Sequence, residues 1–131
     1  MNLDTILIVD DNPVNMKLTR VLLTGEGYDV RTASDASEAF TILQDVHPGL
    51  ILMDIQLPGI DGLELTRRLK ADPATRDIPI VGLTAYAMKG DEERILAAGC
   101  DGYIPKPIDT RTLSDNVRRY LQRTMRRSDD H

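Results

Sequence analysis

The sequence predicts an α/β fold, in which helices cover both faces of a doubly wound, five-stranded parallel sheet. Short runs rich in Val, Ile and Leu alternate along the chain with longer segments whose apolar residues recur at helical spacing. One run, Leu50–Met53, is uniformly apolar and suits a strand buried on both faces, as in parallel sheets. Parallel strands need right-handed helical crossovers, which leave few ways to wind such a sheet.

Five strands are expected from these apolar runs and from the Gly, Pro and Asp residues that bound them. The second run mixes polar and apolar residues, which is typical of an edge strand. The fifth run is short and makes a poor strand. In chain order, the expected strands are Thr5–Val9, Tyr28–Ala33, Leu50–Asp54, Ile78–Leu83 and Asp101–Pro105.

Five helices are expected between and after the strands. Asn12 is a good N-cap for the first helix, and Pro13 fits its first position. Ser34 is expected to cap the second helix, and Asp109 or Thr110 the fifth. Each expected helix has one apolar face. In chain order, the five faces carry Val14, Leu18, Val21 and Leu22; Ala36, Ala39, Phe40 and Leu43; Leu65 and Leu69 within Asp61–Lys70; Met88, Ile95 and Ala98; and Leu113, Val117, Tyr120 and Leu121.

The composition bounds the function classes. The 131 residues suit one domain, and their net charge of -5 disfavours nucleic acid as a partner. The chain has no Trp and a single Phe, Phe40, so a base-stacking platform is not expected. The one cysteine, Cys100, excludes an internal disulfide and fits a reducing compartment. No apolar run reaches membrane length, and we therefore expect a cytoplasmic protein with no membrane partner.

Five chemically active residues share one property: each lies at the carboxyl end of an expected strand. They are Asp10, Asp11, Asp54, Thr84 and Lys106. In a doubly wound sheet these ends meet at one edge, where ligands bind. Carboxylates at about 4 Å repel by on the order of 4 kcal/mol at an effective dielectric near 20, which a cation would relieve. All-oxygen ligands favour Mg²⁺, and a carboxylate nucleophile beside it suits phosphoryl transfer to an aspartate.

Other interpretations of these residues remain open. The acids could form a structural cluster neutralised by Lys106, and Asp54 could merely end its strand. A Mg²⁺-dependent phosphatase with an aspartyl nucleophile is the main enzymatic alternative. Such enzymes usually need a cap or insertion over the substrate and tend to place the nucleophile after the first strand, whereas Asp54 ends the third. We therefore expect phosphoryl transfer to Asp54 itself rather than a phosphatase.

Four motifs together resemble the receiver domain of two-component response regulators, the CheY-like superfamily. They are Val9–Asn12, Met53–Gly62, Leu83–Ala85 and Lys106–Pro107. The resemblance covers the chain from about Thr5 to Leu121 and implies the flavodoxin-like strand order 2-1-3-4-5. It implies a single receiver domain over residues 1–131, with residues 122–131 as a tail. The segment Ala85–Glu93 resembles the DivK-type single-domain regulators and the receivers of hybrid kinases.

The resemblance implies a phosphorelay function with Mg²⁺ as cofactor, and no enzymatic activity beyond self-phosphorylation on Asp54 and autodephosphorylation. Asp54 would accept a phosphoryl group from phosphohistidine. Asp11 and Asp54 would bind the ion directly with the backbone carbonyl of Gln56, and Asp10 mainly through water. Gln56 and Tyr86 occupy the positions that tune hydrolysis of the phosphoaspartate in this family. Bulky Tyr86 is expected to shield the phosphoryl group from water and to prolong its lifetime.

The resemblance also implies the parts of a conformational switch. Thr84 and Lys106 would hold the acyl phosphate, and the Lys106–Pro107 peptide bond would be cis. Tyr103, three residues before the lysine, matches the switch aromatic, whose ring would turn inward as Thr84 moves toward the phosphate. An ordinary edge-strand aromatic is the alternative interpretation of Tyr103.

The resemblance implies a histidine kinase or histidine phosphotransfer protein as the donor. A downstream protein would bind the surface formed by the fourth helix, the fifth strand and the fifth helix. The chain begins with Met1 and ends soon after the fifth helix, which suggests a free-standing chain without an output domain, although a receiver excised from a hybrid kinase is an alternative. The resemblance also implies a monomer or a weak dimer. Five arginines cluster near the end of the fifth helix: Arg118, Arg119, Arg123, Arg126 and Arg127. They could bind DNA, but the simpler explanation is that they are solvated cations that complement the helix dipole.

Overall fold

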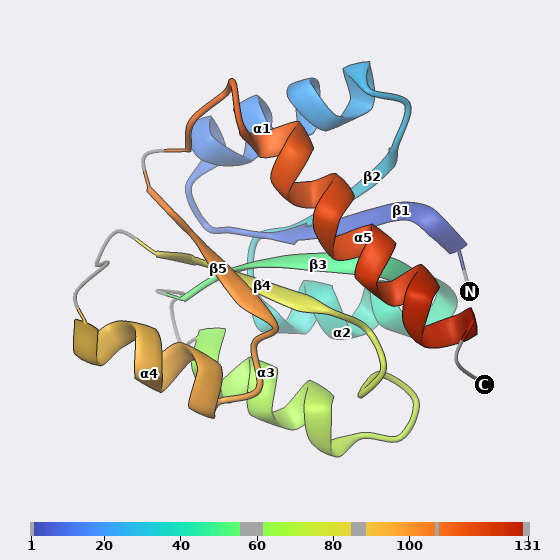
Figure 1. Cartoon of the computed structure of the whole chain (residues 1–131), viewed down its shortest axis with the longest axis vertical. Coiled ribbons are helices and arrows are strands. Elements are labelled where there is room, and N and C mark those ends of the chain that lie inside the picture. Colours follow the sequence, from blue (N-terminus) through green and yellow to red (C-terminus); the bar gives the residue numbers. More distant parts are fainter. Residues whose placement is uncertain (1, 56–61, 85–88, 107, 130–131) are drawn as a thin grey trace.

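The sheet of the computed structural model has the predicted α/β architecture. The structure describes residues 2–55, 62–84, 89–106 and 108–129. Within these residues, five parallel strands form one sheet in the order β2-β1-β3-β4-β5, which confirms the predicted fold (Figure 1). The strands are β1 (Asn2–Val9), β2 (Asp29–Ala33), β3 (Pro48–Asp54), β4 (Ile80–Thr84) and β5 (Gly102–Pro105).

All five strands begin at different residues than predicted, and β2 and β5 each begin one residue later. β1 and β3 begin earlier, because Asn2 pairs with Pro48 before the main register of the two strands. β4 begins at Ile80 rather than Ile78. Pro79 directly precedes Ile80 and has no backbone N–H to donate to a ladder, so the strand begins after it.

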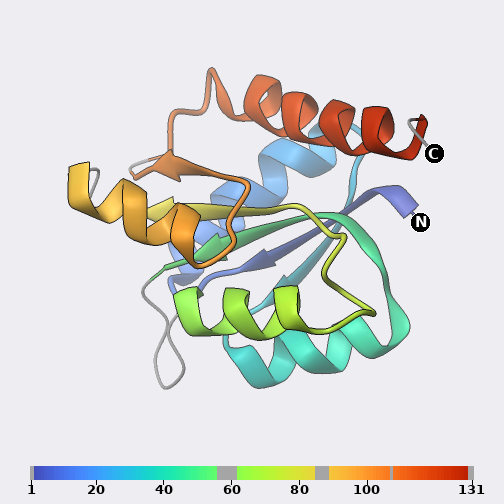
Figure 2. The same ribbon diagram turned by 60° about the horizontal axis from the view of Figure 1, so that its bottom comes forward.

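Helices cover both faces of the sheet in the described part of the chain (Figures 1 and 2). α1 and α5 lie on one face, and α2, α3 and α4 lie on the other. The helices are α1 (Pro13–Gly25), α2 (Ala36–Asp45), α3 (Gly62–Ala71), α4 (Lys89–Ala97) and α5 (Leu113–Asp129). Among the described residues, no helix combines the length and apolar character needed to cross a bilayer.

The central strands are buried on both faces and divide the core into two layers. Ile6 and Ile8 of β1 pack on the α1 and α5 side, whereas Leu7 and Val9 pack on the opposite side. All four side chains are fully buried. Each such burial contributes about 1.5–3 kcal/mol, so the alternation along one strand stabilises both layers. This rigid centre fixes the position of the residues that follow β1 and β3.

The start of α1 follows the predicted capping. The Asn12 side-chain oxygen accepts hydrogen bonds from the backbone N–H groups of Val14 and Asn15, at 3.0 and 3.1 Å. Pro13 occupies the first turn, where its missing N–H costs nothing. Because α1 begins here, the two preceding residues, Asp10 and Asp11, are held at the end of β1.

The predicted cap of α2 was wrong by one residue. Asp35 rather than Ser34 caps α2, since its side chain accepts the backbone N–H of Glu38 at 2.8 Å. Ser34 instead donates its backbone N–H and its hydroxyl to the Glu38 carboxylate. Asp109, one of the two residues predicted to cap α5, accepts the Arg111 backbone N–H through its side-chain Oδ1 at 2.9 Å. α5 begins at Leu113, because the chain first turns over residues 110–112, with the Asp109 carbonyl accepting the Leu113 N–H at 3.1 Å.

Of the apolar face predicted for α1, only Leu22 packs on the core. Thr19 and Leu23 are fully buried instead. Burial of Thr19 costs little because its hydroxyl donates to the Asn15 carbonyl at 2.8 Å. Three of the residues that we expected in the core are exposed: Val14 (74%), Leu18 (39%) and Val21 (57%). α1 therefore presents an apolar stripe outward.

Candidate functional site

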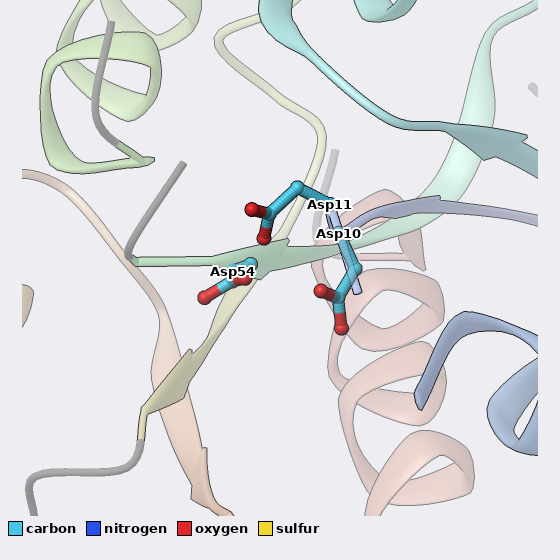
Figure 3. A group of neighbouring side chains, drawn as sticks. All are labelled: Asp10, Asp11 and Asp54. Carbon is cyan, nitrogen blue, oxygen red and sulfur yellow. The ribbon is translucent and has the colours of Figure 1, made fainter. Parts of the chain in front are cut away.

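Three carboxylates meet where β1 and β3 end (Figure 3). Asp10 and Asp11 directly follow β1, and Asp54 is the last residue of β3. The two strands are hydrogen-bonded neighbours, and Val9 pairs with Met53, so Asp10 lies opposite Asp54. One carboxylate oxygen from each acid lies within 4.8 Å of those of the other two. The structure thus brings together acids that are 43 or 44 residues apart in sequence.

Two of the three acids are buried. Asp10 is fully buried and Asp54 is 3% exposed, whereas Asp11 is exposed. Asp10 is held by its backbone N–H, which donates to the Ala33 carbonyl at 3.0 Å, and by its Oδ1, which accepts the Asn12 N–H at 2.9 Å. Its Oδ2 is buried and accepts no hydrogen bond from the described residues. A buried carboxylate oxygen in that state favours a cation beside it.

Lys106 supplies a positive charge to the acids. Its Nζ lies 3.2 Å from Asp54 Oδ1 and 3.8 Å from Asp10 Oδ2. At an effective dielectric of about 20, the nearer pair attracts by about 5 kcal/mol before desolvation is counted. One ammonium against three carboxylates leaves a net charge of -2 in the site when all four groups are ionised. A divalent cation would cancel that charge.

Thr84 lies beside the lysine at the end of β4. It is 4% exposed, and its backbone carbonyl accepts the N–H of Lys106 at 2.7 Å. The Ile55 N–H donates to the Leu83 carbonyl at 3.0 Å and continues the pairing of β3 with β4 past Asp54. These bonds place a hydroxyl, an ammonium and a carboxylate on the adjoining ends of three neighbouring strands.

Gly62 is a positioning residue, although the sequence indicates only a residue that interrupts the apolar pattern after the strand. Its backbone N–H donates to the Ile55 carbonyl at 3.0 Å. A Cβ at this position would collide with the backbone carbonyl of Asp54. Only glycine therefore lets the start of α3 return so close to the strand end that carries Asp54. The spacing of a glycine eight residues after a strand-end acid is the signal that could have indicated this role.

Tyr103 contacts α4. Its hydroxyl donates a hydrogen bond to Glu92 Oε1 at 2.7 Å, and the ring packs on the core layer beneath α2, α3 and α4. This hydrogen bond to the Glu92 carboxylate raises the pKa of Tyr103 above its ordinary value. The sequence reasoning did not single out Glu92, because nothing in the charged pattern of this helix distinguishes it from Glu93.

Several predicted features lie outside the described residues. They are Gln56, Tyr86 and Pro107, and with them the carbonyl ligand, the hydrolysis-tuning positions and the cis peptide bond. The side chains of Arg123, Arg126 and Arg127 also lie outside the described part. These features stay predictions.

The donor set of the site suits a hard divalent cation. Asp10, Asp11 and Asp54 offer carboxylate oxygens, and no His or Cys belongs to the described cluster. Oxygen donors are the ligands that Mg²⁺ prefers, and one or two carboxylates with waters suffice to hold it. The buried Oδ2 of Asp10 and the negative charge left over after Lys106 both fit such an ion.

Comparison with known proteins assigns the family. Residues 6–118 match the family described as the response regulator receiver domain. The chain is 47% identical over 117 residues to the polar-differentiation response regulator DivK of Brucella ovis, a match that covers 89% of this chain and 95% of DivK.

Solved structures agree with this assignment. The magnesium-bound receiver domain of a Pseudomonas aeruginosa sensor histidine kinase is 35% identical, with a TM-score of 0.83 over 93% of this chain and 99% of that one. A chemotaxis response regulator of Vibrio cholerae is 26% identical, with a TM-score of 0.85 over 91% and 99% of the two chains. The chain therefore belongs to the response regulator receiver domain family and is CheY-like in fold.

Proposed function

We propose that the chain is a phosphorelay response regulator in which Asp54 accepts a phosphoryl group from a phosphohistidine residue. The donor is a histidine kinase or a histidine phosphotransfer protein. The observation that carries the proposal is the ion pair of 3.2 Å between Lys106 and Asp54, set within a buried cluster of carboxylates. A nucleophilic carboxylate with a fixed cation beside it is the arrangement that acyl phosphate formation requires.

The transfer uses groups that are already in place. An oxygen of Asp54 attacks phosphorus in line with the bond to the histidine nitrogen. That bond breaks and its electron pair stays on the imidazole, which takes up a proton. The Lys106 ammonium neutralises charge on the transferring phosphoryl oxygens, and the Thr84 hydroxyl donates a hydrogen bond to one of them.

Magnesium is the proposed cofactor. Asp11, Asp54 and the backbone carbonyl of Gln56 would bind the ion directly, and Asp10 mainly through water. When bound, Mg²⁺ supplies positive charge that draws the phosphoryl oxygens and the carboxylate together. The buried Oδ2 of Asp10, which accepts no hydrogen bond from the described residues, supports this assignment, as does the ion coordinated in the active-site cleft of the related Pseudomonas receiver.

The outward stripe of α1 is the proposed docking surface for the donor. Pro13, Val14, Lys17, Leu18 and Val21 line a shallow apolar hollow, which begins two residues after Asp11. Apolar side chains on an exposed helix beside a reaction centre suit a partner that must hold its histidine over that centre. The exposed Lys17 would favour an acidic partner surface.

The proposed output surface is formed by α4, β5 and α5, whose changes would follow phosphorylation. Leu96 of α4 is half-exposed, and Tyr103 of β5 is half-buried, so both are accessible to a partner protein. We further propose a monomer or weak dimer in the cytoplasm, a reducing compartment that suits the buried Cys100 thiol. Gln56 and Tyr86 would set the lifetime of the phosphoaspartate, and Tyr103 would turn inward with Thr84.

Acetyl phosphate labelling, read by intact mass, tests this function. Wild type should gain one phosphoryl group in the presence of Mg²⁺ and none after chelation. Asp54→Asn should gain none, whereas Asp45→Asn, which alters an exposed acid on α2, should react like wild type. No label on wild type from acetyl phosphate or from any phosphohistidine protein would overturn the proposal. Steady turnover of small phosphate esters would instead favour a phosphatase.

A further inference from the structure

The described side chains of α4 make a small apolar contact with the rest of the domain. Among these described side chains, residues 92–97, Ile95 is the buried one, and Leu96 is 50% exposed. Ile95 fits against β4 because Gly82 has no side chain: a Cβ there would lie 3.3 Å from Ile95 Cγ2 and 2.8 Å from Ile55 Cδ1. A helix held by so small an apolar contact is sensitive to each additional bond.

The hydrogen bond from Tyr103 to Glu92 is such a bond. It joins β5 to α4 at 2.7 Å, and its acceptor is a carboxylate, so it is stronger than a bond between neutral groups. Both side chains are half-buried, which limits competition from water. The Tyr103 ring packs on the core layer to which Ile95 also belongs, and Tyr103 pairs with Gly82 in the sheet. The bond and the apolar contact therefore act at the same place.

This bond also lies close to the candidate site. Tyr103 is three residues before Lys106 on the same strand end, and its partner residue on β4, Gly82, is two residues before Thr84. The ring cannot turn toward Thr84 while its hydroxyl remains bonded to Glu92 on α4. Any inward rotation of Tyr103 must therefore break a charge-assisted hydrogen bond and release α4 from β5 at that point.

We propose that Glu92 is a positioning residue that holds Tyr103 against α4 in the unphosphorylated protein and so sets the balance between the two conformations. The inference rests on the proposed phosphorylation of Asp54. The stronger this bond, the smaller the fraction of the protein in the inward conformation. The apparent affinity of a ligand that binds only the inward conformation equals its intrinsic affinity multiplied by that fraction. Removal of the Glu92 carboxylate should therefore tighten binding of such a ligand without changing any residue that touches it.

Beryllofluoride with Mg²⁺, which mimics the phosphoryl group on an aspartate, is the probe. Its half-saturating concentration would be measured from the backbone amide resonances of Thr84 and Tyr103. Glu92→Ala should lower this concentration about fivefold, a coupling of about 1 kcal/mol. Glu92→Gln, which keeps an acceptor but loses the charge, should lower it less. Glu93→Ala removes the same charge from the neighbouring exposed position and should leave it unchanged.

A double variant distinguishes an effect of the hydrogen bond between Tyr103 and Glu92 from a general effect on α4. In a Tyr103→Phe background, Glu92→Ala should have no further effect, because the hydroxyl through which Glu92 acts is gone. An unchanged half-saturating concentration in folded Glu92→Ala, or an equal shift in Glu93→Ala, would overturn the inference. If Glu92→Ala does not fold, the half-saturating concentration of the isosteric variant Glu92→Gln provides the test instead. Failure of the proposed function looks different, since wild type would then neither bind beryllofluoride nor accept phosphate from any donor.

Discussion

Replacement of Asp54 by asparagine should stabilise the metal-free protein while abolishing phosphorylation. Asp54 repels Asp10 and Asp11, whose nearest carboxylate oxygens lie within 4.8 Å of its own. At an effective dielectric of about 20, each repulsion is at least about 3.5 kcal/mol, whereas the attraction to Lys106 is about 5 kcal/mol. The two repulsions together exceed the attraction to Lys106 by about 2 kcal/mol. Asparagine keeps the shape of the side chain and removes the charge.

Urea unfolding in the presence of a chelator measures this difference. The free energy of unfolding of Asp54→Asn should exceed that of wild type by about 1–3 kcal/mol, the lower figure allowing for screening around exposed Asp11. Asp45→Asn carries the same charge change on an exposed surface and should stay within about 0.5 kcal/mol of wild type. An Asp54→Asn variant that is less stable than wild type without metal would refute the electrostatic account.

Magnesium should reduce the stability advantage of the variant. At a concentration about tenfold above its dissociation constant, the ion adds about 1.4 kcal/mol to the stability of wild type, because it binds only the folded state. Asp54→Asn has lost a carboxylate from the cluster and should gain less. The gap between the two proteins should therefore narrow as Mg²⁺ is added. A gap that is independent of Mg²⁺ would argue against metal binding at these acids.

Three further predictions test the scaffold of the site. Gly62→Ala should lower the free energy of unfolding in urea by about 2–4 kcal/mol and slow the labelling of Asp54, because the new Cβ would collide with the Asp54 carbonyl. A variant as stable and as reactive as wild type would contradict this. Lys70→Met should lower the free energy of unfolding by about 1–3 kcal/mol, because it leaves the charge of Asp101, its mostly buried partner at 3.0 Å, without the lysine. An unchanged urea midpoint would show that this ion pair does not stabilise the protein. Burial raises the pKa of the Cys100 thiol, so above about pH 8.5 the thiol ionises first in the unfolded protein. The free energy of unfolding of wild type should therefore fall relative to that of Cys100→Ala as the pH rises above about 8.5. Parallel curves of this free energy against pH for the two proteins would exclude the effect.

The apolar periodicity of the sequence was sufficient to predict the sheet, its helices and the meeting of Asp10, Asp11 and Asp54. The reason is topological: in a parallel sheet with right-handed crossovers, all carboxyl ends share one edge whatever the loops between them do. The uniformly apolar run before Asp54 left little doubt that β3 is central, and the structure buries every residue of it. The four motifs then pointed to the family that the comparisons established.

Only the tertiary structure decided which face of α1 is buried, which residue holds Tyr103, and why position 62 must be glycine. Val14, Leu18 and Val21 form an apolar stripe at helical spacing, yet Thr19 faces the sheet because its hydroxyl is satisfied within the helix. Glu92 and Glu93 are equivalent in sequence, and the rotation of α4 about its axis selects one of them. Periodicity determines that a helix has a face, but long-range packing determines which face it uses, because side-chain contacts between distant segments have no local signal.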